Sequence, residues 1–150
     1  MIETRAVSKS FEKIKAIDNI SVHIDEGHVF GLIGTNGAGK STFMRMLSGV
    51  LRADEGSVLI DEEPVCDNPS AKGKIFYISD DQFFFRSGKS KDMLRLYQAC
   101  YPEFQAAKWR ELMKKFGLDE NRKINTFSKG MKKQLSVICG ICANTKYLLC

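Results

Sequence analysis

Several features that would indicate a membrane-spanning, secreted or disulfide-bonded protein are missing from this sequence. No uninterrupted apolar stretch approaches the roughly 20 residues that a membrane-spanning helix needs. The first residues, Met1 to Arg5, do not form the basic and then apolar segments of a secretory signal peptide. The five cysteines are an odd number without a disulfide framework, so we expect a reduced, cytosolic environment. No internal repeat, low-complexity segment or flexible linker interrupts the chain.

What is present is the composition of an ordinary globular domain. The chain has 150 residues, of which 43% are hydrophobic and 27% are charged, enough to bury a real core. The net charge of +5 suits an anionic partner such as a nucleotide, a nucleic acid or a lipid surface, and does not choose among them.

Residues 34–41 are the most informative segment, because Gly-Thr-Asn-Gly-Ala-Gly-Lys-Ser matches the phosphate-binding pattern G-x-x-x-x-G-K-[ST], known as the P-loop. An apolar run at 29–33 precedes it with the length of a buried strand, and residues 42–47 read as the start of a helix. We expect Lys40 to reach the β- and γ-phosphates of a nucleotide and the Ser41 hydroxyl to coordinate Mg²⁺. The phosphate-binding residues expected from the pattern are Gly34, Asn36, Gly37, Ala38, Gly39, Lys40, Ser41 and Thr42.

The remaining pattern predicts a strand-rich part followed by a helical part. We expect strands at 2–8, 19–24, 29–33, 57–61, 75–78 and 147–150, and a helix after the P-loop that ends near Gly49. Ser90 is expected to cap a helix over 91–100, Pro102 to begin a helix that runs to about Phe116, and Ser128 to precede the last helix. The predicted divisions are a nucleotide-binding core (1–84), a helical subdomain (85–143) and the start of a further core strand (144–150).

The segment Ser128-Lys129-Gly130-Met131 offers a second anion site. Ser128 supplies a hydroxyl, Gly130 an unhindered N–H, and the helix start a positive dipole. Together with the P-loop, this segment resembles the ATP-binding domain of ABC transporters, and the collinear resemblance covers essentially the whole chain. The family's signature segment reads S-x-G-x ahead of a helix. Its form here, Ser-Lys-Gly-Met, and the segment Tyr101-Pro102-Glu103-Phe104 are most similar to bacterial ATPases of the ABC-2 export type.

The resemblance implies an α/β P-loop NTPase of ABC type that binds ATP and Mg²⁺. Phe11 would stack on adenine, and Ser128 with Gly130 would bind the γ-phosphate of ATP held on another subunit's P-loop. The implied partners are a second ATP-binding subunit, in a homo- or heterodimer, and a transmembrane permease that exports a substrate. The implied location is the cytoplasmic inner face of the membrane, and nucleic acid is not an expected partner.

At the end of the strand 75–78 the family has a glutamine that touches Mg²⁺, and here that position is Asp80. A carboxylate can also contact Mg²⁺, directly or through water. Asp80 is therefore a candidate metal ligand together with Ser41, and a candidate catalytic residue together with Lys40. Asp81 and Gln82 follow, and which of the three residues serves is left open. A solvated acidic turn is the alternative.

Three further features could suggest a chemical role, and we assign a catalytic or metal-binding role to none of them. Phe83–Phe85 is apolar for a loop, and we expect a docking patch for a membrane partner combined with a larger share buried in the helical core. Cys139 and Cys142 form a C-x-x-C at helical spacing, where two buried side chains are expected rather than a redox or metal pair. His23 and His28 match no family position, so no chemistry is assigned to them.

The family's next motif is an aspartate and a glutamate directly after the strand at 147–150, and neither occurs in this sequence. We therefore expect a chain truncated before its catalytic carboxylates, with the C-terminal part of the core missing, which binds ATP but hydrolyses it poorly. A soluble ABC-type ATPase acting on nucleic acid or ribosomes and a non-catalytic nucleotide-sensing fragment stay open as alternatives.

Overall fold

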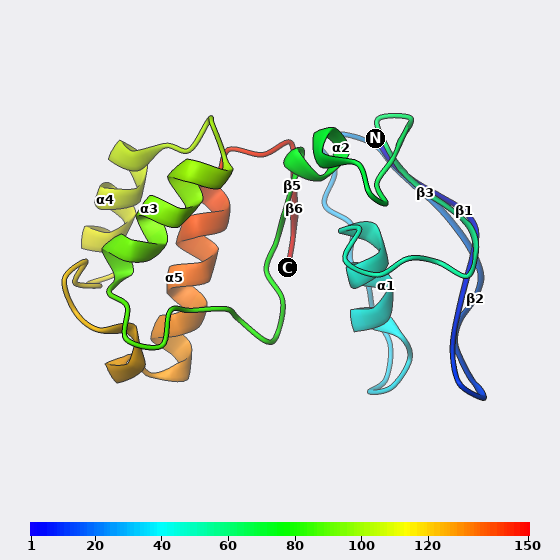
Figure 1. Ribbon diagram of the computed structural model, residues 1–150, viewed down its shortest axis with the longest axis horizontal. Helices are drawn as coiled ribbons and strands as arrows, with labels where there is room; N and C mark the ends of the chain where they lie inside the picture. The colour runs from blue at the N-terminus through cyan, green and yellow to red at the C-terminus, as the bar shows by residue number, and fades with distance from the viewer. The chain divides into compact units, whose positions relative to one another are not determined.

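The computed structural model describes residues 1–150 and separates them into two units (Figure 1). The first contains residues 1–75 with Leu149, and the second contains residues 76–148 with Cys150. None of the helices is both long enough and apolar enough to cross a bilayer.

A four-stranded antiparallel sheet in the order β2-β1-β3-β4 forms most of the first unit. Its strands are β1 (Ile2–Phe11), β2 (Ile14–Ile24), β3 (Glu55–Ile60) and β4 (Glu63–Pro64). Ile2 pairs with Ile24 on one side and Ile60 on the other, which fixes the register of the three long strands. β1 and β2 extend beyond the ranges 2–8 and 19–24 that the alternation of side chains predicts.

Helix α1 (Lys40–Leu47) packs on β2 and β3 through its buried side chains Phe43, Met46 and Leu47. A short helix, α2 (Pro69–Gly73), begins after Asn68, whose side chain accepts hydrogen bonds from the N–H groups of Ser70 and Ala71. The sequence did not predict α2 or the two-residue strand β4.

The strand expected at residues 29–33 is absent. These residues belong to neither sheet, and the side chains of Val29 and Ile33 are 102% and 96% exposed. A strand exists only when neighbouring backbone pairs with it. The apolar composition predicted burial, but no other segment supplies that pairing, so the prediction was wrong.

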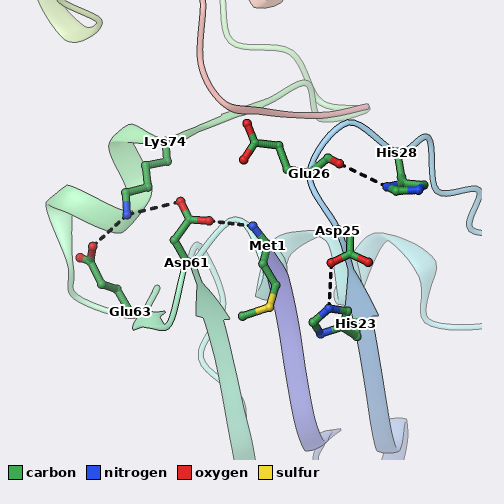
Figure 2. A network of polar contacts seen from close by, with 8 residues as sticks. All are labelled: Met1, His23, Asp25, Glu26, His28, Asp61, Glu63 and Lys74. Atoms are coloured by element: carbon green, nitrogen blue, oxygen red, sulfur yellow. Dashed lines mark hydrogen bonds and ion pairs between the residues drawn. The ribbon is translucent and has the colours of Figure 1, made fainter.

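Ion pairs join the start of β1 to the segment after β3 (Figure 2). The amino group of Met1 lies 2.7 Å from Asp61 Oδ1, and Lys74 Nζ lies 3.5 Å from Asp61 Oδ2 and 2.8 Å from Glu63 Oε1. The Lys74 ammonium, followed by the Asn68 amide, lowers the pKa of Glu63. The network ties the end of α2 to the sheet.

Three helices form most of the second unit, with contacts between each pair (Figure 1). Its elements are α3 (Ser90–Cys100), α4 (Ala106–Lys115), the 3₁₀ turn η1 (Ile124–Thr126) and α5 (Lys129–Cys142). β5 (Ile75–Tyr77) and β6 (Tyr147–Leu149) pair with each other in a separate sheet. Fully buried Trp109, Met93, Leu135 and Ile138 lie at the centre of the helical core.

Two helix starts differ from those predicted. Lys89 rather than Ser90 precedes α3, and the capping contact comes from Asp92, which accepts the Lys89 N–H at 2.8 Å. Helix α4 begins at Ala106 rather than at Pro102. Turns precede it, because the Phe104 N–H donates to Tyr101 O and the Ala106 N–H donates to Phe104 O. Both helices end where predicted to within about one residue.

Candidate functional site

The P-loop joins the unpaired segment 29–33 to α1 in the first unit. Ala38 N–H donates to Thr35 O at 3.2 Å inside the loop, and Phe43 N–H donates to Gly39 O at 2.8 Å where the helix begins. The first turn of α1 contains no acidic residue. Its free N–H groups and the positive end of the helix therefore favour an anion at this place.

Gly39 is required by the geometry of the loop. Its φ is 81°, and a Cβ there would lie 2.3 Å from Ala16 O. Only glycine fits this left-handed conformation at such close approach. The end of the P-loop is thereby pressed against the start of β2.

Lys40 ties the two ends of the P-loop together. Its Nζ donates to Gly34 O and to Thr35 O, both at 2.7 Å. A Cβ on Gly34 would lie 3.2 Å from Ala38 Cβ and 3.8 Å from Lys40 Cδ, so the loop leaves little space for a side chain at position 34. The cation is held at the mouth of the loop, where the phosphates of a nucleotide would meet it.

Ser41 and Thr42 follow in the first turn of α1, and the Ser41 side chain is exposed. The chain contains no group of three or more His, Cys, Asp or Glu side chains that could hold a metal ion. Mg²⁺ is commonly held by one or two protein oxygens together with substrate phosphates. The Ser41 hydroxyl at the phosphate-binding loop fits that mode, in which the nucleotide supplies the other ligands.

Phe11 lies at the end of β1, opposite Ile14 at the start of β2. The side chain is 46% exposed, so the ring has a face open for stacking. Gly39 contacts Ala16 on the same strand β2. The fold thus places the aromatic candidate and the P-loop at the same end of one hairpin.

The Ser128–Met131 segment begins α5 as predicted. Ser128 is the residue before the helix, and its Oγ accepts the Met131 N–H at 3.2 Å. Ser128, Lys129 and Gly130 are exposed, and a Cβ on Gly130 would meet only Ser128 Oγ at 3.8 Å. Packing within the chain therefore does not explain why position 130 is glycine.

Asp80 is exposed after β5 in the second unit, and Gln82 is half-buried. The loop that follows carries Phe83 and Phe85, whose rings lie 5.5 Å apart, edge to face. Phe83 is 64% and Phe85 38% exposed, while Phe84 packs on the helical core. Two of the three rings are exposed, so the expectation that the core takes the larger share was wrong.

Cys139 and Cys142 are buried in α5, as predicted. Burial raises the pKa of Cys139 to about 12 and that of Cys142 to about 11. Thiols held in the protonated form are poor nucleophiles and poor metal ligands, so the C-x-x-C is structural. His23 contacts Asp25 at 3.0 Å and His28 contacts Glu26 O at 3.2 Å, both at the surface (Figure 2).

The P-loop is exposed at residues 34–38. A hollow of about 430 Å³ lies over β1 and β2 between Glu3 and His23, and one of about 400 Å³ lies beside α4 between Arg110 and Asn121. P-loop residues line neither of them. A nucleotide on the P-loop would need a further surface to enclose it.

Two residues near Phe11 were missed by the sequence reasoning, one in contact with its ring and one in contact with that first residue. Lys9 lies over the Phe11 ring, and Asp54 pairs with Lys9. The spacing of two residues on one strand could have indicated the first contact. Nothing in the sequence indicates the second, because Asp54 is separated from Lys9 by 45 positions.

The profile of the ABC transporter family matches residues 17–150, so the chain belongs to that family. It is 32% identical over 149 residues to the ABC transporter ATP-binding protein YtrB of Bacillus subtilis, covering 99% of this chain and 51% of the relative. It is also 32% identical over 161 residues to the methionine import ATP-binding protein MetN of Clostridium tetani, covering all of this chain and 50% of the relative. The chain spans about half the length of the curated relatives it matches.

Solved structures confirm the α/β fold of ABC type. An ATP-binding subunit of an ABC transporter superposes with a TM-score of 0.87 at 23% identity, covering 99% of this chain and 65% of that one. A dimeric bacterial ABC transporter cassette, MJ0796, superposes with a TM-score of 0.85 at 21% identity, covering 99% and 72%. These identities are low, so the likeness concerns the fold.

Proposed function

We propose that this chain is the ATP-binding part of an ABC transporter subunit, located at the cytoplasmic face of a membrane. The observation that carries the proposal is the P-loop. The Lys40 ammonium bonds Gly34 O and Thr35 O, and the first turn of α1, which follows the loop, contains no acidic residue. Residues 34–42 would surround the β- and γ-phosphates with N–H groups, and Phe11 would stack on the adenine.

Mg²⁺ would be held by the Ser41 hydroxyl and the phosphates. Asp80 is the proposed further contact, with Asp81 and Gln82 as the alternatives. When bound, the metal neutralises charge on the β- and γ-phosphates. Lys40 would have two roles here, because its ammonium orders the loop and would also contact the phosphates.

Replacing Asp80 with Asn should weaken Mg²⁺-dependent ATP binding and leave metal-free binding unchanged, because only the proposed contact to the metal is removed. Loss of both kinds of binding would assign Asp80 a structural role.

A second ATP-binding subunit, in a homo- or heterodimer, would complete the site. The exposed Ser128 hydroxyl and the open space at Gly130 suit the γ-phosphate of ATP held on the partner's P-loop. The exposure of residues 34–38 of this chain's own P-loop is consistent with that arrangement. One relative by fold is described as a dimeric cassette.

Gly130→Asp tests this arrangement, because a carboxylate would repel the γ-phosphate, and the added Cβ would meet only Ser128 Oγ, at 3.8 Å. We expect ATP to promote dimerisation of the wild-type protein in sedimentation experiments and not of Gly130→Asp, whose thermal stability should be equal to the wild type's or higher, because an acidic residue suits the first turn of α5. Dimerisation of both proteins to the same extent would contradict the proposed role of Ser128 and Gly130.

Hydrolysis needs a group that orients the attacking water, and that contribution is large in phosphoryl transfer. Residues 147–150 are Tyr-Leu-Leu-Cys and offer no carboxylate for it. We propose that residues 1–150 bind ATP and turn it over slowly. Steady-state turnover should match that of Lys40→Ala, and a wild-type rate well above the variant's would show that the stretch is catalytic by itself.

Phe83 and Phe85 are the proposed contact for a transmembrane permease, because two exposed rings side by side form an apolar surface. Export as the direction of transport rests on the resemblance of residues 101–104 and 128–131 to the ABC-2 type. Relatives named for methionine and ribose import also match the chain. Uptake and efflux assays with the complete transporter would decide the direction.

A further inference from the structure

Lys9 makes two contacts that the proposed nucleotide chemistry does not use. Its Nζ lies 5.7 Å from the centre of the Phe11 ring, over one face. The same nitrogen lies 2.5 Å from Asp54 Oδ1. Lys9 and Phe11 are two residues apart on β1, so their side chains leave the same face of the strand.

Asp54 is fixed to β1 by more than this ion pair. Its Oδ2 accepts the Ser10 N–H at 2.8 Å, and its own N–H donates to Ser8 O at 2.9 Å. The hydrogen bond from Lys9, followed by that from Ser10, lowers the pKa of Asp54, so the carboxylate is ionised at neutral pH. The Lys9 side chain is only 15% exposed, which leaves its ammonium little freedom to move.

Phe11, in contrast, has few constraints of its own. It is the last residue of β1, it is 46% exposed, and Glu12 turns the chain directly after it with a φ of 52°. An aromatic ring that must be ordered when its ligand binds loses affinity through that ordering. A cation fixed over one face restrains the ring and leaves the opposite face for a base.

We propose that Asp54 is a positioning residue for the nucleotide base, acting through Lys9 on the ring of Phe11. Neither Asp54 nor Lys9 touches the nucleotide in this arrangement. The proposal rests on the proposed function, in which Phe11 stacks on the adenine of ATP bound at the P-loop. The competing explanation is a surface ion pair that only fastens β1 to the turn before β3.

Calorimetric titration with ATP and with inorganic tripolyphosphate, which lacks a base, separates these explanations. Asp54→Asn keeps an oxygen for the Ser10 N–H and removes the charge that holds Lys9. We expect it to weaken ATP binding by about two- to fivefold, as an exposed ion pair allows, and to leave tripolyphosphate binding unchanged. Lys9→Met should have the same effect, and Lys9→Arg, which keeps a cation, should retain the preference for ATP.

Glu3→Gln is the matched control, because Arg5 and Glu3 form an exposed ion pair on the same strand, away from Phe11. This variant should bind both ligands as the wild type does. If Asp54→Asn changes both affinities equally, or changes neither, the positioning role is wrong although Phe11 still stacks. If Phe11→Ala keeps the wild-type preference for ATP over tripolyphosphate, the adenine contact itself is wrong and the positioning role falls with it.

Discussion

Single side chains in this protein show how burial decides chemistry. Ser90 and Ser8 are both serines with almost no exposed surface. Ser8 Oγ accepts the Asn19 N–H at 3.1 Å, whereas Ser90 Oγ has no hydrogen-bond partner. A buried polar group without a partner costs free energy that a paired one recovers.

We therefore predict opposite outcomes for the same substitution. Ser8→Ala removes the buried hydroxyl that accepts the Asn19 N–H and should lower the free energy of unfolding by about 1 kcal/mol. Ser90→Ala removes an unpaired hydroxyl and should be neutral or slightly stabilising. Urea denaturation of both variants measures the difference, and a larger loss in Ser90→Ala would show that its hydroxyl has a partner.

Cys139 and Cys142 should not react with thiol reagents in the native protein at pH 8. Their pKa values are raised to about 12 and about 11, and both side chains are buried. Exposed Cys100 and Cys150 should react quickly, and half-buried Cys66 more slowly. Mass spectrometry after brief labelling counts the modified thiols, and fast labelling of residues 139 and 142 would contradict their burial.

The same thiols give stability a dependence on alkaline pH. Unfolded thiols ionise near their ordinary pKa of 9, while the folded chain keeps both protons to higher pH. The folded state binds more protons in that interval, so the free energy of unfolding should fall as pH rises from 9 towards 11 and 12. Their contribution is fully present below pH 9, and replacing both with Ala should flatten this part of the stability profile.

Among the elements, the bulge in β1 explains a requirement that the sequence does not show. β1 shifts its register against β2 between Thr4 and Val7, and against β3 between Arg5 and Ser8. Gly56 of β3 faces this bulge with a φ of 78°, and a Cβ there would lie 2.3 Å from Arg5 O. The constraint comes from backbone atoms, which do not move aside as a side chain does.

Gly56→Ala should therefore lower the free energy of unfolding by roughly 2 kcal/mol or more, through both the left-handed φ and the clash. Gly73, at the end of α2, is the matched control, because its φ is ordinary and a Cβ would meet nothing within 4 Å. Gly73→Ala should be neutral or stabilising. Equal effects of the two substitutions in thermal denaturation would show that the bulge relaxes.

The elements also show which parts of the structure a sequence can predict. The P-loop motif located α1, and Ser128 located the start of α5, because each depends on local backbone chemistry. The strand at 29–33 failed because pairing depends on another segment. Asp54 and the exposed Phe83 and Phe85 were missed or misjudged for the same reason, since contacts and burial are decided by residues far along the chain.

For the whole molecule, the structure contains two helix starts that we propose as anion sites, one at Lys40 in the first unit and one at Ser128 in the second. The family match covers residues 17–150, which include both helix starts. We propose that the first of these sites binds the phosphates of ATP, and that Lys40 both orders the loop and contacts the ligand.

Calorimetric titration of Mg-ATP into the wild-type protein and into Lys40→Met tests this claim most directly. Methionine keeps the length and the apolar stem of Lys40 and removes the ammonium that bonds Gly34 O and Thr35 O. We expect saturable binding of one nucleotide per wild-type chain and a loss of affinity of at least about tenfold in Lys40→Met, because a charge-assisted contact is removed. Equal affinities, or no binding by the wild type, would contradict it.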